Sequence, residues 1–314
     1  MITRARTALT ALIAAIMIPT VAAMPARAAT ATFPVVADCS PFTDFYNSWQ
    51  QLPHELYAVG TRWVPQGLAY DPVDHWLIIS YYDGRDGVAT ADKYPSMLVA
   101  TTLSGRFVKH LVINTADVGP GGHAGGLGVG HHSLYISSTD HGTRVTRIPL
   151  GVIGQATDGS TLPDSTSYQV AAASYATVAA NGDLYVGDFE NDLMYRYRTN
   201  HAGDPVSTPT TYPTPTLVQG VAVADDEFIF SRSYGRTRES FLSIVDRRTG
   251  SQNDVVMPNM LEGISWAPAS RRGRGTDLYT LFESGSAAYG AGDDGGATTC
   301  STTHLWHRPE TALP

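Results

Sequence analysis

Residues 217–236 read LVQGVAVADDEFIFSRSYGR and show one structural unit with little interruption. An apolar run that opens at Gln219 is closed by an Asp225-Asp226 turn, and a second run from Phe228 ends in polar residues. This is the pattern of a strand, a tight turn, a second strand and a polar tip. The unit recurs at residues 65–83, 124–140, 175–190 and 262–284. The sequence therefore predicts a repeat protein.

The five copies align on the residue that precedes a small Gly or Ala. The aligned residues are Gln66, Gly125, Tyr175, Gln219 and Glu262. They recur roughly every 40 to 60 residues, a period typical of propeller blades. Solenoids of similar period are built from helices, and no window of this sequence favours helical periodicity over alternation. We therefore predict an all-β protein with the fold of a five-bladed β-propeller.

The first 28 residues have the composition of a secretory signal peptide. Arg4 and Arg6 precede an apolar stretch at residues 8–18, and Ala26-Arg27-Ala28 offers small residues for cleavage. The apolar stretch is shorter than the ~20 residues that span a bilayer, which disfavours a retained anchor. We therefore predict a signal peptide over residues 1–28 and a single propeller domain over residues 29–314 in a secreted, extracellular protein.

The charge of the chain limits its partners. The net charge is −8, and loss of three arginines with the signal peptide makes the chain more acidic. No run of Lys or Arg is present that would bind nucleic acid or an anionic membrane. We expect neither of these partners, and instead a monomer that binds a small molecule or saccharide.

The two cysteines, Cys39 and Cys300, lie near opposite ends of the chain. Export to an oxidising compartment favours a disulfide between them over two free thiols. A propeller must also join its first and last blades to avoid an open edge. The last repeat lacks an outer strand, which the N-terminal segment, with a strand candidate at residues 55–59, would supply. We predict a ring closed by this segment and by the disulfide.

Polar residues gather at one end of the predicted inner strands. The ring contains Gln66, Tyr175, Gln219 and Glu262, and His123 lies two residues before Gly125. A second aligned position, at the end of the following strand, adds Tyr81, Asp188, Arg232 and Glu283. Loops at a channel mouth commonly carry function, so this ring predicts a hydrated site for a polar ligand. For the second position, the competing interpretation is that Asp and Ser form turns.

Residue types suggest a role for each position. The catalytic candidates are His123, Tyr175 and Glu262, of which His123 or Tyr175 would move a proton and Glu262 would be the second acid or base. Arg232 would bind a substrate carboxylate through two parallel hydrogen bonds. The other substrate-binding candidates are Gln66, Tyr81, Asp188, Gln219 and Glu283. Glycines 121, 122, 125 and 126 around His123 would let the backbone approach a ligand.

Metal and cofactor signals are weak. Two histidines with Glu262 could hold a metal ion, but their spacing is not an established ligand motif. The acidic, glycine-rich residues 290–296 could bind calcium, although a flexible loop is the favoured interpretation. The Gly-x-Ser-x-Gly, Walker and His-Glu-x-x-His motifs are absent from the sequence. We predict no metal and no cofactor.

The segments PQGLAYD, HAGGLGV, LYVGDF and VQGVAV with SRSYGR resemble secreted actinobacterial β-propeller proteins, from about Trp63 to Trp306. They are loosely similar to lactonase-like and lyase-like propellers. The lactonase-like resemblance implies a calcium ion held by Glu, Asn and Asp, but only Glu262 in the matching ring is charged. The lyase-like resemblance implies a catalytic site that uses His, Tyr and Arg side chains. His123, Tyr175 or Tyr81, and Arg232 are of these types.

Two functions are compatible with these observations. In the first, the protein is an enzyme, either a lyase or a hydrolase, that acts on a polar, anionic carbohydrate or lactone at the channel mouth. Alternatively, it is a non-catalytic propeller that binds a glycan or a protein. The mixture of acid, base and cation types at one end of the channel favours the enzyme.

Overall fold

The computed structural model describes residues 33–84, 94–114, 123–139, 142–163, 165–269, 275–289 and 297–314. The predicted signal peptide and the glycine-rich residues 290–296 lie outside these ranges. Within them, no helix has the length and apolar character needed to cross a bilayer.

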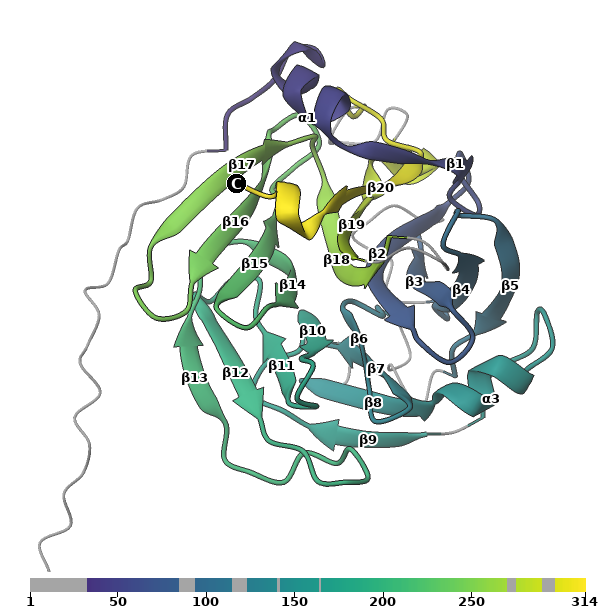
Figure 1. Ribbon diagram of the computed structural model, residues 1–314. Coiled ribbons are helices and arrows are strands. Elements are labelled where there is room, and N and C mark those ends of the chain that lie inside the picture. The colour runs from purple at the N-terminus through teal and green to yellow at the C-terminus, as the bar shows by residue number, and fades with distance from the viewer. Residues whose placement is uncertain are drawn as a thin grey trace, which may run out of the picture. The chain divides into compact units, whose positions relative to one another are not determined.

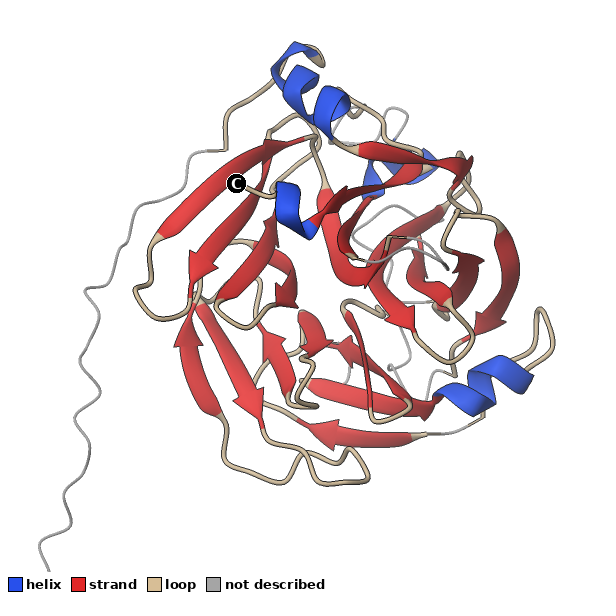
Figure 2. Cartoon of the chain, in the orientation of Figure 1, coloured by secondary structure: helices blue, strands red, loops and turns tan. Residues whose placement is uncertain are grey.

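Five antiparallel sheets of four strands each surround a common centre (Figures 1 and 2). Blade 1 contains β2 (Trp63–Asp71), β3 (Trp76–Asp83), β4 (Met97–Thr102) and β5 (Phe107–Val112). Blade 2 contains β6 (Leu127–Gly130), β7 (Ser133–Ser138), β8 (Arg144–Pro149) and β9 (Thr166–Gln169). Blade 3 contains β10 (Tyr175–Val178), β11 (Leu184–Gly187), β12 (Leu193–Tyr197) and β13 (Thr210–Pro213). Blade 4 contains β14 (Val218–Val223), β15 (Glu227–Arg232), β16 (Ser240–Asp246) and β17 (Gln252–Met257). Blade 5 contains β18 (Leu261–Pro268), β19 (Thr276–Phe282), β20 (His304–Pro309) and β1 (Gln50–Glu55). The predicted five-bladed β-propeller is confirmed.

The helices in the described residues are short. The α-helices are α1 (Thr43–Ser48) and α3 (Leu150–Gln155), and the 3-10 helices are η1 (Ser40–Phe42), η3 (Glu283–Gly285), η4 (Ala287–Tyr289) and η5 (Glu310–Ala312). In α1, Phe45 packs against Trp306 of β20 with ring centroids 4.9 Å apart. This contact anchors the N-terminal segment to blade 5.

The N-terminal segment closes the ring as predicted, but with a different strand. β1 pairs antiparallel with β20, with Gln50 opposite His307. Of the strand predicted at residues 55–59, only the first residue belongs to β1, and the rest forms a turn. There Ala58 has a φ of 62°, and its carbonyl accepts a hydrogen bond from the Thr61 amide. A left-handed residue interrupts the extended backbone that a strand requires, and alternating residue types did not reveal this conformation.

The predicted disulfide between Cys39 and Cys300 is present, with the two Cα atoms 5.6 Å apart. Cys300 is buried in an apolar cluster together with Phe42, Phe45 and Trp49. The bridge therefore joins the segment before α1 to the segment before β20 inside a packed region.

Replacement of both Cys39 and Cys300 by serine is expected to lower the free energy of unfolding by about 2–4 kcal/mol, because the bridge closes a loop that spans most of the chain. Urea denaturation of the variant and of the oxidised wild type measures this difference. Equal stability of the two proteins would show that the packing of α1 holds the ring closed without the bridge.

The inner strands approach one another backbone to backbone. A Cβ atom added to Gly126 would lie 2.2 Å from the amide nitrogen of Ala176 in β10, and one added to Gly125 would lie 2.6 Å from the Ser174 carbonyl oxygen. Because these two residues have no side chain, the backbone of the next blade can pack directly against them. Packing between blades therefore accounts for Gly125 and Gly126, whereas Gly121 and Gly122, which were predicted to make room for a ligand with them, lie outside the described residues.

Apolar clusters fill the spaces between blades. Between blades 3 and 4, for example, Tyr175 and Tyr185 pack with Phe228 and Phe230. Buried serines add polar links: Ser80 Oγ accepts from the Gly67 amide (2.9 Å) and donates to the Ala124 carbonyl oxygen of the next blade (2.9 Å). These contacts fix the positions of the inner strands, which carry the candidate site.

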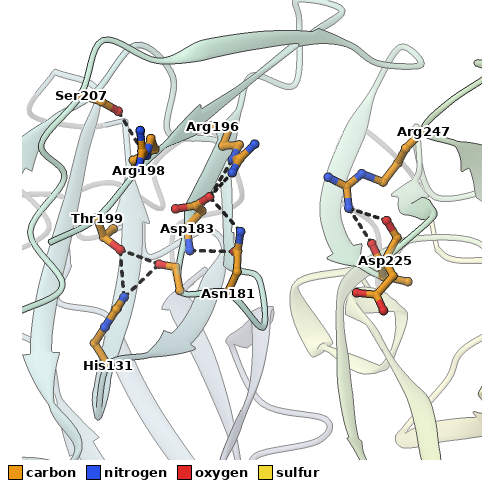
Figure 3. Close-up of polar contacts among 11 residues, drawn as sticks. His131, Asn181, Asp183, Arg196, Arg198, Thr199, Ser207, Asp225 and Arg247 are labelled. Carbon is orange, nitrogen blue, oxygen red and sulfur yellow. Dashed lines mark hydrogen bonds and ion pairs between the residues drawn. The ribbon is translucent and has the colours of Figure 1, made fainter. Parts of the chain in front are cut away.

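The turns at the opposite end of the strands are also tied together. His131 Nε2 lies 3.1 Å from the Gly182 carbonyl oxygen and 2.9 Å from Thr199 Oγ1, which links blade 2 to blade 3 (Figure 3). The Asp183 carboxylate binds Arg196 within blade 3, and Arg247 donates to the Asp225 carbonyl oxygen in blade 4 (Figure 3). The polar side chains at this end stabilise turns.

Candidate functional site

Irregular strand pairing places three of the predicted ring residues. The pairing of inner strands with their neighbours shifts between Pro65 and Leu68 in β2, between Val218 and Gly220 in β14, and between Leu261 and Ile264 in β18. The residues within these shifts are Gln66, Gln219 and Glu262. A β-bulge redirects a side chain out of the regular alternation. The bulges therefore take these three side chains out of the regular alternation of their strands.

Gln66, His123 and Glu283 form a hydrogen-bonded chain. Gln66 Nε2 donates to Glu283 Oε1 and to the Pro65 carbonyl oxygen, and Gln66 Oε1 lies 2.9 Å from His123 Nε2. An amide oxygen only accepts, so His123 Nε2 carries a proton in this contact. The chain runs from Glu283, which is 8% exposed, to the half-buried His123. The chain therefore connects the buried Glu283 carboxyl group to His123, whose side chain is partly accessible to solvent.

Two tyrosines complete the surroundings of Glu283. Burial and the negative charge of Glu283 raise the pKa of Tyr289 in η4. The hydroxyl oxygen of Tyr289 lies 2.7 Å from that of Tyr82. The Tyr82 ring also contacts the His123 ring, with centroids 4.8 Å apart. We name Gln66, Tyr82, His123, Glu262, Glu283 and Tyr289 the carboxyl cluster.

The second carboxyl, Glu262, has a separate set of partners. Ser233 Oγ donates to Glu262 Oε1 (3.2 Å), and Gln219 Nε2 donates to Ser233 Oγ (3.2 Å). Glu262 is only 3% exposed. Both carboxyl groups belong to blade 5. Glu262 accepts its hydrogen bond from blade 4, whereas Glu283 accepts its hydrogen bond from Gln66 of blade 1.

The two carboxyl groups have different electrostatic surroundings. Burial raises the pKa of Glu283 to about 7, against the opposing effects of His123, Tyr289, Gln66 and Arg236. Burial raises the pKa of Glu262 well above its usual value, and the negative charge of Glu283 raises it further. Environments that separate the pKa values of neighbouring acids are typical of acid–base sites. Burial thus raises the pKa of both acids, and only Glu283 has a histidine and an arginine that oppose the rise.

Arg236 is the cation beside the cluster. Its guanidinium carbon lies 4.7 Å from the centre of the Tyr289 ring, and its charge opposes the rise in the pKa of Glu283. The SRSYGR segment was singled out in the sequence for Arg232. Arg236 follows four residues later in the same segment. The chain turns at Gly235, which has a φ of 81°, so strand alternation does not predict where the Arg236 side chain lies.

Arg232 is not brought to the carboxyl cluster. Its side chain is buried, and its guanidinium donates to the Thr216 carbonyl oxygen (2.9 Å) and to Ser243 Oγ (3.1 Å). It also lies 3.6 Å from Asp254 of β17 and stacks over the Phe33 ring. These contacts direct Arg232 into blade 4.

Three further predicted residues lie apart from the cluster. Tyr175 and Tyr81 are buried in the apolar clusters between blades 3 and 4 and between blades 1 and 5. The Asp188 carboxylate accepts hydrogen bonds from the Glu190 amide (2.8 Å) and from Asn191 Nδ2 (2.9 Å). Asp188 therefore caps a turn, the competing interpretation for strand tips. The sequence did contain the information needed to select Tyr82. Side chains alternate along a strand, so Tyr82 points to the opposite face of β3 from Tyr81.

A cavity of about 450 Å³ lies at the other end of the inner strands. Its wall includes Tyr70, Val129, Val178, Val223 and Trp266, one residue from each blade. Along β2 and β18 its lining begins at Ala69 and Ser265, each three residues from a residue of the carboxyl cluster. In the parts of the chain that the structure describes, no three His, Cys, Asp or Glu side chains are grouped as a metal site.

No protein-family model matches the sequence, and no curated protein matches it. Among solved structures, the GH43_1 enzyme from Xanthomonas citri in complex with xylose is similar at 13% identity and a TM-score of 0.47, over 83% of this chain and 89% of that one. A putative oxidoreductase (glucose dehydrogenase) from Thermus thermophilus is similar at 12% identity and a TM-score of 0.46, over 82% and 99%. A chain of the nidogen/laminin complex has 11% identity and a TM-score of 0.44, over 78% and 83%. These similarities are too low to indicate an activity.

Proposed function

We propose that the protein is a hydrolase that cleaves a polar carbohydrate or lactone bond at the channel mouth by general acid–base catalysis. The observation that carries the proposal is the pair of buried carboxyl groups, Glu262 and Glu283, whose pKa values are both raised by burial. Burial of two acids without a matching number of cations costs folding free energy. Groups held in this way are characteristic of functional sites.

The surroundings of the two acids assign the roles. The Glu283 carboxylate receives a hydrogen bond from Gln66, and His123 and Arg236 oppose the effect of burial on its pKa. It acts as the base that takes a proton from the attacking water. Glu262 holds its proton at neutral pH and gives it to the leaving oxygen as the bond breaks. One proton is accepted and one is donated, so the pair is ready for another cycle after the protons exchange with solvent.

The remaining polar residues would bind the substrate. His123, Gln66 and Gln219 are half-buried, and hydrogen bonds link each of them to one of the two acids. Arg236 supplies positive charge that suits an anionic substrate, the role predicted from the sequence for Arg232.

The test is a screen of lactones and of neutral and acidic oligosaccharides, with products detected by mass spectrometry. We expect one class to be hydrolysed by the wild type and not by Glu262→Gln, which keeps the shape of the acid but has no proton to give. Glu227→Gln is the matched control and should retain full activity, because Glu227 is the first residue of β15 and lies at the opposite end of that strand from Arg232 and Ser233.

Other outcomes of the screen would contradict the proposal. An unsaturated product, detected by its ultraviolet absorbance, would identify a lyase. Binding of a glycan without turnover, with affinity alone changed by Glu262→Gln, would identify a non-catalytic binding propeller.

A further inference from the structure

Asn259 is a fully buried polar residue between β17 and β18, and its side chain joins two distant segments. Its Oδ1 accepts a hydrogen bond from the Cys300 amide (3.1 Å), and its Nδ2 donates to the Arg236 carbonyl oxygen (2.9 Å). The amide of Thr299 donates to the same Arg236 oxygen (3.3 Å). The backbone of Arg236 is therefore fixed to the disulfide region.

The guanidinium of Arg236 extends from this fixed backbone to the ring of Tyr289, 4.7 Å away. Tyr289 lies in one buried cluster with Met260, whose carbonyl oxygen accepts a hydrogen bond from the Glu283 amide (3.0 Å). A charge near a buried acid has a large effect on its protonation because little solvent screens it. The path from Asn259 to Glu283 thus contains only one charged residue, Arg236.

Asn259 also precedes a strained residue. Met260 has a φ of 64°, and its carbonyl oxygen accepts a hydrogen bond from the Glu283 amide (3.0 Å). A left-handed conformation of a residue with a side chain persists only where neighbouring contacts enforce it. The two hydrogen bonds of Asn259 are contacts of this kind.

We propose that Asn259 is a positioning residue, whose amide holds Arg236 over Tyr289 and so sets the charge beside Glu283. The consequence for catalysis rests on the proposed function, whereas the placement of charge does not. The titratable and charged groups that face Glu283 are His123 before β6, Tyr82 of β3, Arg236 between β15 and β16, Glu262 of β18 and Tyr289 of η4. Of these, Asn259 contacts Arg236.

The experiment follows the protonation of Glu283 by carbon NMR of the glutamate carboxyl groups, with Glu283→Gln used to assign the signal. Arg236→Met is expected to raise the midpoint, since it removes a cation that favours the carboxylate. Asn259→Ala should raise it by about half a pH unit, because the guanidinium is no longer held in place. In the Arg236→Met background, Asn259→Ala should cause no further shift.

Asn191→Ala is the matched control, since Asn191 is an exposed asparagine that bonds Asp188 at the tip of blade 3. It should leave the midpoint unchanged. If Asn259→Ala does not fold, Asn259→Ser serves instead, because it keeps a polar group at this position without adding a charge near Glu283.

Two results would overturn the proposal. One is a folded Asn259 variant, judged by near-ultraviolet circular dichroism, with the midpoint of the wild type. The other is an equal shift with and without Arg236, which would show that Asn259 acts on the cluster by another route. The measurement uses no substrate, so a protein without hydrolytic activity would still decide it.

Discussion

Replacement of Glu283 by glutamine is expected to lower turnover by about 10²-fold or more, the usual effect of losing a general base. Glutamine has nearly the same shape, and its oxygen can still accept the hydrogen bond from Gln66. It cannot take a proton from water. Steady-state kinetics with the substrate found in the screen would show the loss in kcat, with KM little changed.

The same variant gives a pH test. Because Glu283 acts as a carboxylate and burial raises its pKa to about 7, wild-type activity should fall as the pH drops below about 7. The residual activity of Glu283→Gln should lack this acid limb. An unchanged limb in the variant would assign it to another group and would remove Glu283 from the role of base.

The raised pKa also has a consequence for stability. A folded-state pKa above the unfolded value means that the folded protein binds more protons between the two values, so stability falls as the pH rises through this window. For Glu283 the window extends from about 4.5 to about 7. Thermal unfolding across this range should show a decline in the wild type that Glu283→Gln reduces.

Gly126→Ala is expected to destabilise the fold by about 3 kcal/mol or more. The added methyl group would lie 2.2 Å from the Ala176 nitrogen and 2.7 Å from the Tyr175 Cα, both backbone atoms. A backbone cannot rotate away as a flexible side chain can, so β6 and β10 must separate and the packing of two blades is lost. Urea denaturation with tryptophan fluorescence would measure the change.

Gly151→Ala is the control for this prediction. Gly151 lies in α3, and an added Cβ would have no atom within 4 Å. Alanine is the better helix former, so this variant should be as stable as the wild type or slightly more stable. Equal effects of the two substitutions would mean that glycine packing at the channel does not limit the approach of the blades.

Sequence patterns predicted the blades because each blade repeats a local signal. The apolar runs, the Asp225-Asp226 turn and the polar tips are set by neighbouring residues, and five copies reinforce one another. The closing strand was predicted in the correct blade but at the wrong residues. Its position depends on the left-handed Ala58 and on pairing with β20, whose residues are distant in the sequence.

The candidate site was harder to predict for a similar reason. Alignment placed Gln66, Gln219, Glu262 and His123 at one end, and Glu283 at the matching tip, and these lie together in the structure. Tyr289 belongs to no repeat and reaches the cluster through a 3-10 helix after β19. The opposite orientation of Arg232 arises from Asp254 and Thr216, partners that a local pattern does not include.

The pairing of β1 with β20 sets a time order for folding. During synthesis β1 emerges before every other strand of the propeller, yet its partner, His304–Pro309, emerges after all of them. Until then residues 50–55 have no sheet to join, and blade 5 presents a bare edge to neighbouring chains. A nascent chain stalled before His304 should therefore be a target for chaperones and proteases, and a chain released intact completes its ring in one late, long-range step.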